Sequence, residues 1–241
     1  PDGTLKHRII WDYRRSGVNL KSVMPERIVL PDIDDAVEDV RSIHKLYGEL
    51  AEFMGTDIQD AFHNVDLHPA EHGNTLCLID GVPYTFTSLV FGSKNAPLIW
   101  GRVSAWLGRM AVTTINDLRL QIFVDDPLFM CPKSKAATAF AAAILLITWL
   151  GLPIAWDKTE GGPKLRWIGA MVEVSANFVT LTIPEDKRDA MATILREMSK
   201  KPNVPLSDVR SIAGKASHSA TIVKNLRPFA DQLWAAASFT T

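Results

Sequence analysis

Two aspartates that stand side by side directly after an apolar strand constrain this chain more than any other feature. Leu120, Ile122 and Val124 alternate with other side chains over residues 119–124, as expected for a half-buried strand, and Asp125 and Asp126 follow at once. Ionised carboxylates beside apolar groups are costly unless a positive charge neutralises them. The pair therefore predicts that something positively charged binds at this strand end.

A second strand that ends in an acid comes earlier in the sequence. Residues 52–58, EFMGTDI, are typical of a short strand, with Asp57 near its end. If the two strands are neighbours in one sheet, Asp57, Asp125 and Asp126 converge, and their repulsion requires a cation. Oxygen ligands select a hard divalent ion, Mg²⁺ first and Mn²⁺ second, and two such ions can clamp both reacting oxygens of a phosphoryl transfer. For any single aspartate the alternative is a turn former or a helix cap.

Length and composition indicate a globular protein with a sizeable core. The 241 residues allow one large or two small domains. Because 47% of the residues are hydrophobic and 22% are charged, the composition excludes a chain that is disordered throughout. The longest apolar run, residues 136–151, is too short and too rich in alanine for a bilayer span, so we expect a buried helix and no membrane. Cys77 and Cys131 have no metal-binding spacing and favour a reducing compartment, the cytoplasm or the nucleus. Because the chain begins at Pro1, we expect it to be part of a longer polypeptide.

Charge is distributed unevenly along the chain, although the net charge is only −1. Residues 1–27 and 187–227 are basic, whereas residues 31–60 are acidic. Basic flanks around an acidic middle suit a chain that contacts phosphates at its ends and metal at its centre. An uneven surface charge without function is the alternative, and the charges alone do not decide between the two.

Hydrophobic periodicity and helix-start signals predict an α+β chain. Helices are expected over 31–48, 94–118, 134–150 and 184–200, and a last helical region is expected to be capped by Ser207 and broken by Pro228. Strands are expected over 7–13 and 52–58, and strand pairs around Gly81 and over 165–183. The expected buried stripes are Ile33, Val37, Val40 and Leu46 in the first helix and Ile99, Val103, Trp106, Met110 and Ile115 in the second. Elements become mostly helical from Pro184, which predicts a domain boundary between 183 and 184.

Six short motifs follow one another along the chain. KHRIIWDYRRSGVN contains D-x-R, TDIQDAFHNVDLHP contains D-x-x-x-A-F, and LVFGSKNAPLIWGRV contains F-G-x-x-N-A-P. FVDD, GLPIAWDKT and LRWIGAMVEV come after them. In this order the six resemble the fingers, palm and primer-grip motifs of retroelement reverse transcriptases. PLSDVRSIAGKASHSA resembles the thumb of retrotransposon polymerases, with details similar to the tyrosine-recombinase type.

The resemblance implies a fold and a set of roles. The fold is the right-hand polymerase fold, with fingers and an antiparallel palm sheet backed by helices over 1–183 and a helical thumb-like segment over 184–241. Asp57, Asp125 and Asp126 are expected to hold two Mg²⁺ ions, or Mn²⁺, with the Ile58 carbonyl as a further ligand. The other expected roles are general acid for Lys158, nucleotide or template contacts for Lys6, Arg8, Phe62, Phe91, Gly92 and Lys94, and primer grip for Trp167 and Gly169.

Several of these residues have a simpler alternative. Phe62 is expected to be the aromatic gate that excludes a 2′-hydroxyl; the alternative, which propensity alone favours, is a core residue at the start of an apolar helix. Surface positions are the alternative for Lys6, Arg8 and Lys158, and packing in the core is the alternative for Phe91 and Trp167. His63, His68 and His72 lack the spacing of a zinc site.

The function implied is that of an RNA-directed DNA polymerase, which extends a primer with dNTPs on an RNA or DNA template. Two departures from the family pattern accompany it: Phe123 stands where a Tyr is usual, and Pro127 removes one N–H after the acid pair. One alternative is therefore a decayed or domesticated copy that binds RNA–DNA hybrid without turnover. A second alternative is an RNA-dependent RNA polymerase, against which Phe62 argues. Fusion to further polyprotein domains is also expected.

Overall fold

The structure is a computed structural model that describes residues 9–176 and 178–238. Its chain divides into two compact units, each assembled from several stretches of sequence. The first unit contains the described part of 1–31 together with 56–127 and 137–159. The second contains 32–55, 128–136 and the described part of 160–241. The predicted boundary between residues 183 and 184 separates the expected fingers and palm from the expected thumb, and it stays a prediction.

Four strands form one antiparallel sheet, in the order β4-β5-β1-β6. Its strands are β1 (Ala51–Gly55), β4 (Arg119–Phe123), β5 (Asp126–Pro132) and β6 (Glu160–Gly162). Phe53 in β1 lies opposite Met130 of β5 on one side and Gly162 of β6 on the other. The register continues to the pair Gly55 and Leu128; Asp57 follows Gly55 closely in the chain, and Asp126 closely precedes Leu128.

The core of the second unit forms where helix α2 (Ile33–Tyr47) packs on these strands. Asp32 begins the helix, because its carboxylate accepts from the N–H groups of Asp34 and Asp35, and Gly48 ends it in the left-handed conformation. The hydrophobic core of this unit combines residues of α2 with residues of β1, β5 and the next sheet: Ile33, Val40, Ile43, Phe53, Met130, Trp167 and Val172. That next sheet contains β7 (Lys164–Trp167), β8 (Ala170–Val174) and β9 (Val179–Thr182).

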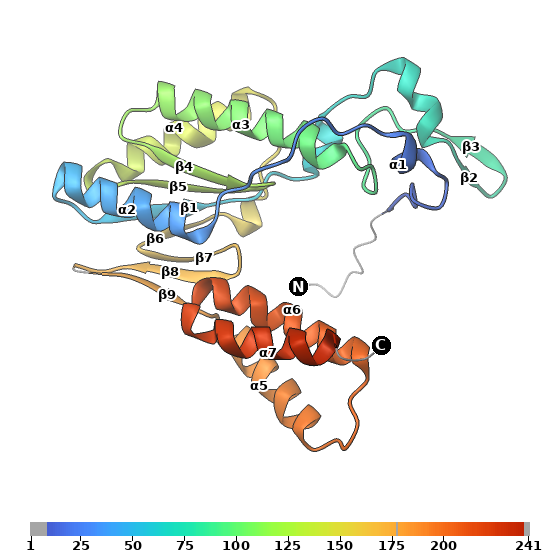
Figure 1. Cartoon of the computed structure of the whole chain (residues 1–241). Coiled ribbons are helices and arrows are strands. Elements are labelled where there is room, and N and C mark those ends of the chain that lie inside the picture. Colours follow the sequence, from blue (N-terminus) through green and yellow to red (C-terminus); the bar gives the residue numbers. More distant parts are fainter. Residues whose placement is uncertain (1–8, 177, 239–241) are drawn as a thin grey trace. The chain divides into compact units, whose positions relative to one another are not determined.

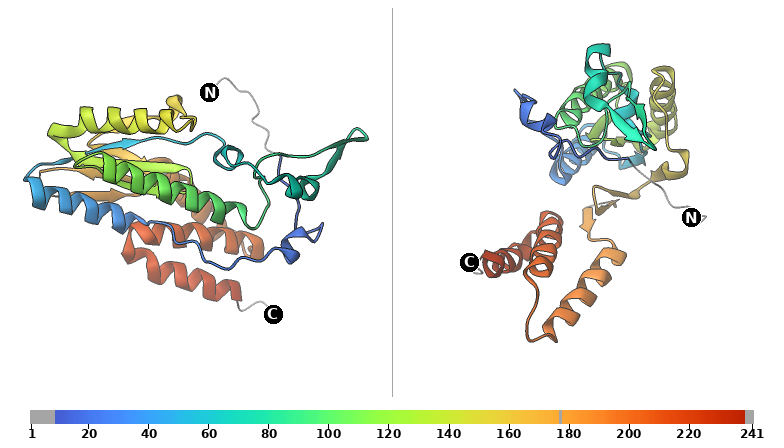
Figure 2. Two further views of the ribbon diagram at one scale, coloured as in Figure 1. Left: turned by 90° about the horizontal axis from the view of Figure 1, so that it is seen from above. Right: turned by 90° about the vertical axis from the view of Figure 1, so that its right-hand side faces the viewer.

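Three helices complete the second unit: α5 (Glu185–Ser199), α6 (Leu206–Ile222) and α7 (Arg227–Ser238). Helices α6 and α7 lie side by side (Figures 1 and 2). The Trp234 indole of α7 donates to the Ser217 hydroxyl of α6 at 2.8 Å. Lys224, in the short helix η5 (Lys224–Leu226), forms an ion pair with Asp34 of α2.

The first unit contains a β-hairpin and two long helices. Strands β2 (Cys77–Ile79) and β3 (Val82–Tyr84) form the hairpin, which lies at one end of this unit (Figures 1 and 2). The helices are α3 (Ala96–Thr114) and α4 (Ala136–Trp149), and α3 packs on β4. Shorter helices are α1 (Val18–Lys21), η1 (Ala61–Asn64), η2 (Pro69–Thr75), η3 (Lys133–Lys135) and η4 (Trp156–Lys158).

The predicted α+β class is confirmed, and most predicted elements are present with boundaries shifted by a few residues. The predicted strand over 7–13 is wrong for its described part, since residues 9–12 belong to no strand. The predicted roles of Ser207 and Pro228 are also wrong. Helix α6 begins at Leu206 after Pro205, and Pro228 lies in the first turn of α7, where proline costs no hydrogen bond.

The predicted buried stripes are correct only in part. In α2, Leu46 is exposed and Ile43 takes its place in the core. In α3, Trp106 is exposed, and the buried face contains Trp100, Leu107 and Ala111. The apolar residues of α3 surround the helix, so spacing alone selected the wrong face. In the part of the chain that the structure describes, no helix is both long and apolar enough to cross a membrane.

The position of Phe53 at the centre of the core gives a stability prediction. Its side chain is fully buried between two neighbouring strands. Phe53→Ala should lower the free energy of unfolding by about 3–5 kcal/mol, because the lost contacts leave a cavity. Chemical denaturation followed by circular dichroism measures the loss. Phe229→Ala, at an exposed site on α7, is the control and should change stability little; equal effects of both variants would contradict the position of the core.

Candidate active site

The segments that carry the predicted catalytic acids lie side by side in the first unit. Asp125 lies in the turn between β4 and β5, and Asp57 comes soon after β1. The backbone N–H of Ile58 donates to the Asp125 carbonyl at 2.9 Å, and the N–H of Thr56 donates to the Pro127 carbonyl at 3.3 Å. The two segments are thus directly hydrogen-bonded on both sides of Asp57, as expected for neighbouring strand ends.

Lys158 is the positive group that the structure places on Asp57. Its ammonium forms an ion pair and a hydrogen bond with the Asp57 carboxylate. The segment that carries it is fixed nearby, because the Ala155 N–H donates to the Asp57 carbonyl at 2.9 Å and Ile154 bridges to Ile58. The Lys158 side chain is 54% exposed and the Asp57 side chain is 22% exposed, so water screens the pair mainly from the lysine side. A divalent cation that reaches Asp57 would compete with Lys158 for its carboxylate.

The acids fit a divalent metal by their chemistry, although they are not gathered in advance. Among the residues that the structure describes, no three His, Cys, Asp or Glu side chains form a ready metal-binding group. Asp57, Asp125 and Asp126 nevertheless offer only oxygen donors from two hydrogen-bonded segments, which suits a hard ion. Shared coordination by the three acids and by the Ile58 carbonyl stays a prediction.

The loop with the predicted nucleotide contacts Phe91, Gly92 and Lys94 is fixed by the segment near the start of the described chain. The Trp11 N–H donates to the Phe91 carbonyl at 2.9 Å. Gly92 has a φ of 101°, and a Cβ there would lie 2.0 Å from the Trp11 carbonyl oxygen. Only glycine therefore fits this position without displacing the backbone.

Asn19 holds the same loop from a second side, and sequence reasoning did not identify this residue. Its side-chain amide donates to the Gly92 carbonyl at 2.9 Å, and its side-chain oxygen accepts from the Lys94 N–H at 2.9 Å. The Lys94 ammonium donates to the Ser22 carbonyl at 3.3 Å. A single Asn in a helix as short as α1 carries no periodic signal, so only the three-dimensional contact identifies it.

Aromatic rings pack around Phe62, the predicted sugar gate. Its ring centroid lies 5.0 Å from that of Phe91, and His63 stands edge-on to Phe91 at 5.7 Å. Phe62 and Phe91 are both partly buried. Each ring can therefore pack against its neighbours and still present one face to a ligand. The three histidines contact neighbouring groups: His63 bonds with the Ser88 hydroxyl, His68 accepts from the Ala70 N–H, and His72 bonds with the Leu67 carbonyl.

The predicted primer-grip residues lie in the second unit. Trp167 is almost fully buried in the core of that unit, so its side chain supports the hairpin from inside. Gly169 turns the chain between β7 and β8 with a φ of 87°. A Cβ on it would lie 2.5 Å from His218 Nε2 and 2.6 Å from Lys187 Nζ, so two groups with basic nitrogens cover this turn. Lys6 and Arg8 lie outside the described residues.

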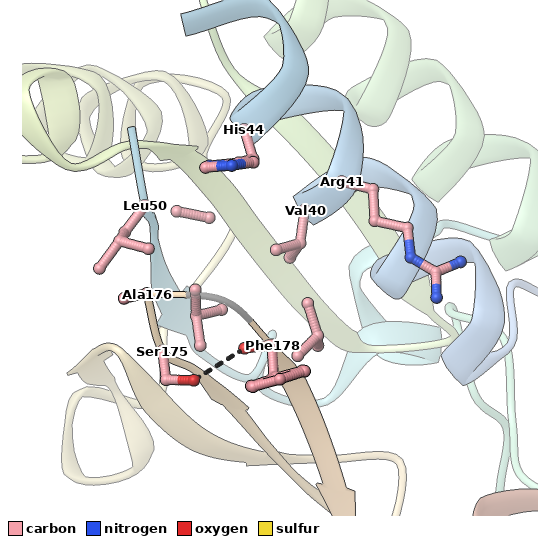
Figure 3. Close-up of a pocket in the computed structure, with 10 residues that line it drawn as sticks. Val40, Arg41, His44, Leu50, Ser175, Ala176 and Phe178 are labelled. Carbon is pink, nitrogen blue, oxygen red and sulfur yellow. Dashed lines mark hydrogen bonds between the residues drawn. The ribbon is translucent and has the colours of Figure 1, made fainter. Parts of the chain in front are cut away.

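A separate hollow of about 340 Å³ lies in the second unit, between α2 and the end of the β8–β9 hairpin (Figure 3). Val40, Arg41 and His44 line it from α2, and Ser175 and Phe178 line it from the hairpin. None of the predicted site residues lines this hollow.

Comparison with known proteins agrees with this arrangement. A sequence model of the family "Reverse transcriptase (RNA-dependent DNA polymerase)" matches residues 3–172. The retrovirus-related Pol polyprotein from transposon 412 of Drosophila melanogaster is 27% identical over 121 residues, which are 50% of this chain and 9% of the polyprotein. This chain thus corresponds to a small part of that relative.

Solved structures give the same fold. The foamy viral protease-reverse transcriptase dRH in complex with double-stranded DNA matches with a TM-score of 0.72 and 16% identity, over 100% of this chain and 38% of that one. A foamy viral protease-reverse transcriptase in complex with dsDNA matches with a TM-score of 0.66 and 15% identity, over 95% of this chain and 44% of that one. Together with the family match over most of its length, this shows that the chain belongs to the reverse transcriptase family and has its polymerase fold.

Proposed function

We propose that this chain is the polymerase part of a retrotransposon reverse transcriptase and adds dNTPs to a primer 3′-hydroxyl. The observation that carries the proposal is the hydrogen-bonded contact between the segments of Asp57 and Asp125, with Lys158 on the Asp57 carboxylate. Acids on two hydrogen-bonded segments, with one basic group on Asp57, suit phosphoryl transfer, in which positioning and charge neutralisation do most of the catalysis.

The three acids would share one task, which is to bind the metal ions. Asp57, Asp125 and Asp126, with the Ile58 carbonyl, would hold two Mg²⁺ ions, or Mn²⁺ in their place. Bound there, such ions lower the pKa of a hydroxyl and neutralise phosphate charge. The primer 3′-hydroxyl loses its proton to water and its oxygen attacks the α-phosphorus of the dNTP, the bond from that phosphorus to the bridging oxygen breaks, and pyrophosphate leaves.

Lys158 is suited to serve the leaving group. Its ammonium is paired with Asp57 and is half-exposed, so it is available once Asp57 turns to another partner. A lysine near phosphates can donate its proton to the departing pyrophosphate oxygen. Lys158 would therefore leave the Asp57 carboxylate first and then donate its proton to the pyrophosphate.

The nucleotide would lie against the loop that Trp11 and Asn19 hold. Gly92 allows close approach of backbone there, and Lys94 adds a positive charge. Phe62 would close the space beneath the sugar, with Phe91 behind it. Arg8 and Lys6 complete the proposal as triphosphate contacts.

A template–primer duplex is the proposed macromolecular partner. The solved relatives are complexes with double-stranded DNA and, in one structure, with RNA/DNA hybrid. We assign the turn at Gly169, next to Trp167, to the primer, residues 1–183 to fingers and palm, and residues 184–241 to the thumb. In the cell this part would be fused to further polyprotein domains, in the cytoplasm or the nucleus.

Pro127 gives no support to a decayed copy. It is buried in β5, and its carbonyl accepts from the Thr56 N–H, so the contact beside Asp57 forms despite the missing N–H. A non-catalytic hybrid-binding protein and an RNA polymerase remain as outcomes that primer extension with dNTPs or rNTPs on an RNA template distinguishes.

Removal of one acid tests the metal assignment. Asp125→Asn should reduce primer extension by at least a thousandfold while leaving the fold intact, because the amide cannot supply the negative charge that a metal needs. Extension assays in Mg²⁺ and in Mn²⁺, with circular dichroism, measure both properties. Asp80→Asn, in the β2–β3 turn, is the control and should extend normally. Wild-type extension by the Asp125 variant would refute the assignment.

Truncation of the proposed gate tests sugar selection. Phe62→Ala should raise the efficiency of ribonucleotide incorporation relative to dNTPs by about tenfold or more, since the space for a 2′-hydroxyl opens. Steady-state kcat/KM values for matched dNTP and rNTP pairs provide the measurement. Phe178→Ala, an exposed Phe outside the predicted site, should leave the ratio unchanged. If Phe62→Ala also leaves it unchanged, Phe62 is a packing residue only.

Two glycines with similar backbone angles test the loop. Gly92→Ala and Gly81→Ala both place a side chain at positive φ, but only the Cβ at position 92 would collide with Trp11. Gly92→Ala should therefore cost about 1–3 kcal/mol more stability and raise the KM for dNTPs. Thermal unfolding and nucleotide kinetics compare the two variants. Equal losses would contradict the close approach of Trp11 to the loop.

A further inference from the structure

The turn that carries the acid pair has an unusual backbone. Val124, directly before Asp125, has a φ of 59°. This left-handed conformation is ordinary for Gly and Asn, but it crowds a β-branched side chain. A Val in this conformation persists only where surrounding contacts impose it.

Trp100 provides such a contact. It lies on α3 with its side chain fully buried, and its indole N–H donates to the Val124 carbonyl at 2.6 Å. An indole has one donor and no acceptor, so a buried Trp needs a partner of this kind. The helix thus fixes the position of one peptide group next to the acid pair.

The peptide on the other side of Asp125 is fixed as well. The Asp125 carbonyl accepts from the Ile58 N–H at 2.9 Å, in the segment of Asp57. The backbone of Asp125 is therefore held between Trp100 and Ile58, and all of these residues belong to the first unit. A side chain whose backbone is fixed at both ends has few directions open to it.

We propose that Trp100 is a positioning residue for the acid pair. Its indole N–H holds the Val124 peptide in the left-handed turn and so directs Asp125 and Asp126 toward the segment of Asp57. Trp100 acts through the backbone and contacts neither metal nor nucleotide. This inference rests on the proposed function for its effects on metal binding and on catalysis, but not for its effect on the backbone of the turn.

The first variant is Trp100→Phe, which keeps an aromatic ring in the core but removes the donor. Hydrogen exchange of peptides that cover 119–127 should become at least tenfold faster. Binding of Mn²⁺ alone, followed by calorimetry without nucleotide, should weaken at least tenfold. The kcat for primer extension should fall by a similar factor, with the KM for template–primer unchanged.

The second variant separates the hydrogen bond from packing. Val124→Asn in the Trp100→Phe background places a residue that adopts positive φ readily, so the turn should need the indole less. Hydrogen exchange and Mn²⁺ affinity should both return to within threefold of the wild-type values. Trp106→Phe, at a half-exposed site on the same helix, is the control and should change neither.

Three results would overturn the proposal. One is unchanged exchange over 119–127 in Trp100→Phe. Another is a loss of Mn²⁺ affinity that Val124→Asn does not recover, which would assign the effect to core packing. The third is an equal effect of Trp106→Phe. If the wild-type chain extends no primer, the proposed function fails, while hydrogen exchange still decides the role of Trp100.

Discussion

The hydrogen bond from the Ile58 N–H to the Asp125 carbonyl is the contact on which the account of this site depends. It forms because β1 and β5 pair in register up to Gly55 and Leu128, and the chain continues past that pair on both sides. Strand pairing thereby delivers two acid-bearing segments to one place. Phe53 and Met130, which lie opposite each other in β1 and β5, are buried in the core that supports this pairing.

Lys158 neutralises Asp57 beside the point where the two acid-bearing segments are hydrogen-bonded. The Lys158 side chain is 54% exposed and the Asp57 side chain is 22% exposed, so water reaches the pair mainly from the lysine side. Without a positive partner, Asp57 would repel the neighbouring acids. In the proposed mechanism, the Asp57 carboxylate would serve a metal and Lys158 would face the phosphates.

The sequence predicted the parts of this molecule that local rules control. Helix α2 follows from the Asp32 cap and its apolar spacing, and the acid pair follows from a strand that ends in carboxylates. The contacts of Asn19 and Trp100 were not predictable, because each joins positions far apart through one side chain and a backbone carbonyl. The apolar residues of α3 surround the helix, so the sequence did not determine which face is buried. Pro228 is compatible both with the end of one helix and with the first turn of the next, so it did not determine where α7 begins.

The central claim is that Asp57 and the acid pair share a divalent metal. A crystal structure with template–primer, an unreactive dNTP analogue and Mn²⁺, measured at the manganese absorption edge, tests it most directly. We expect anomalous peaks at about 2.1–2.2 Å from carboxylate oxygens of both Asp57 and Asp125. Peaks that contact only one of the two segments, or peaks elsewhere with nucleotide bound, would contradict the account.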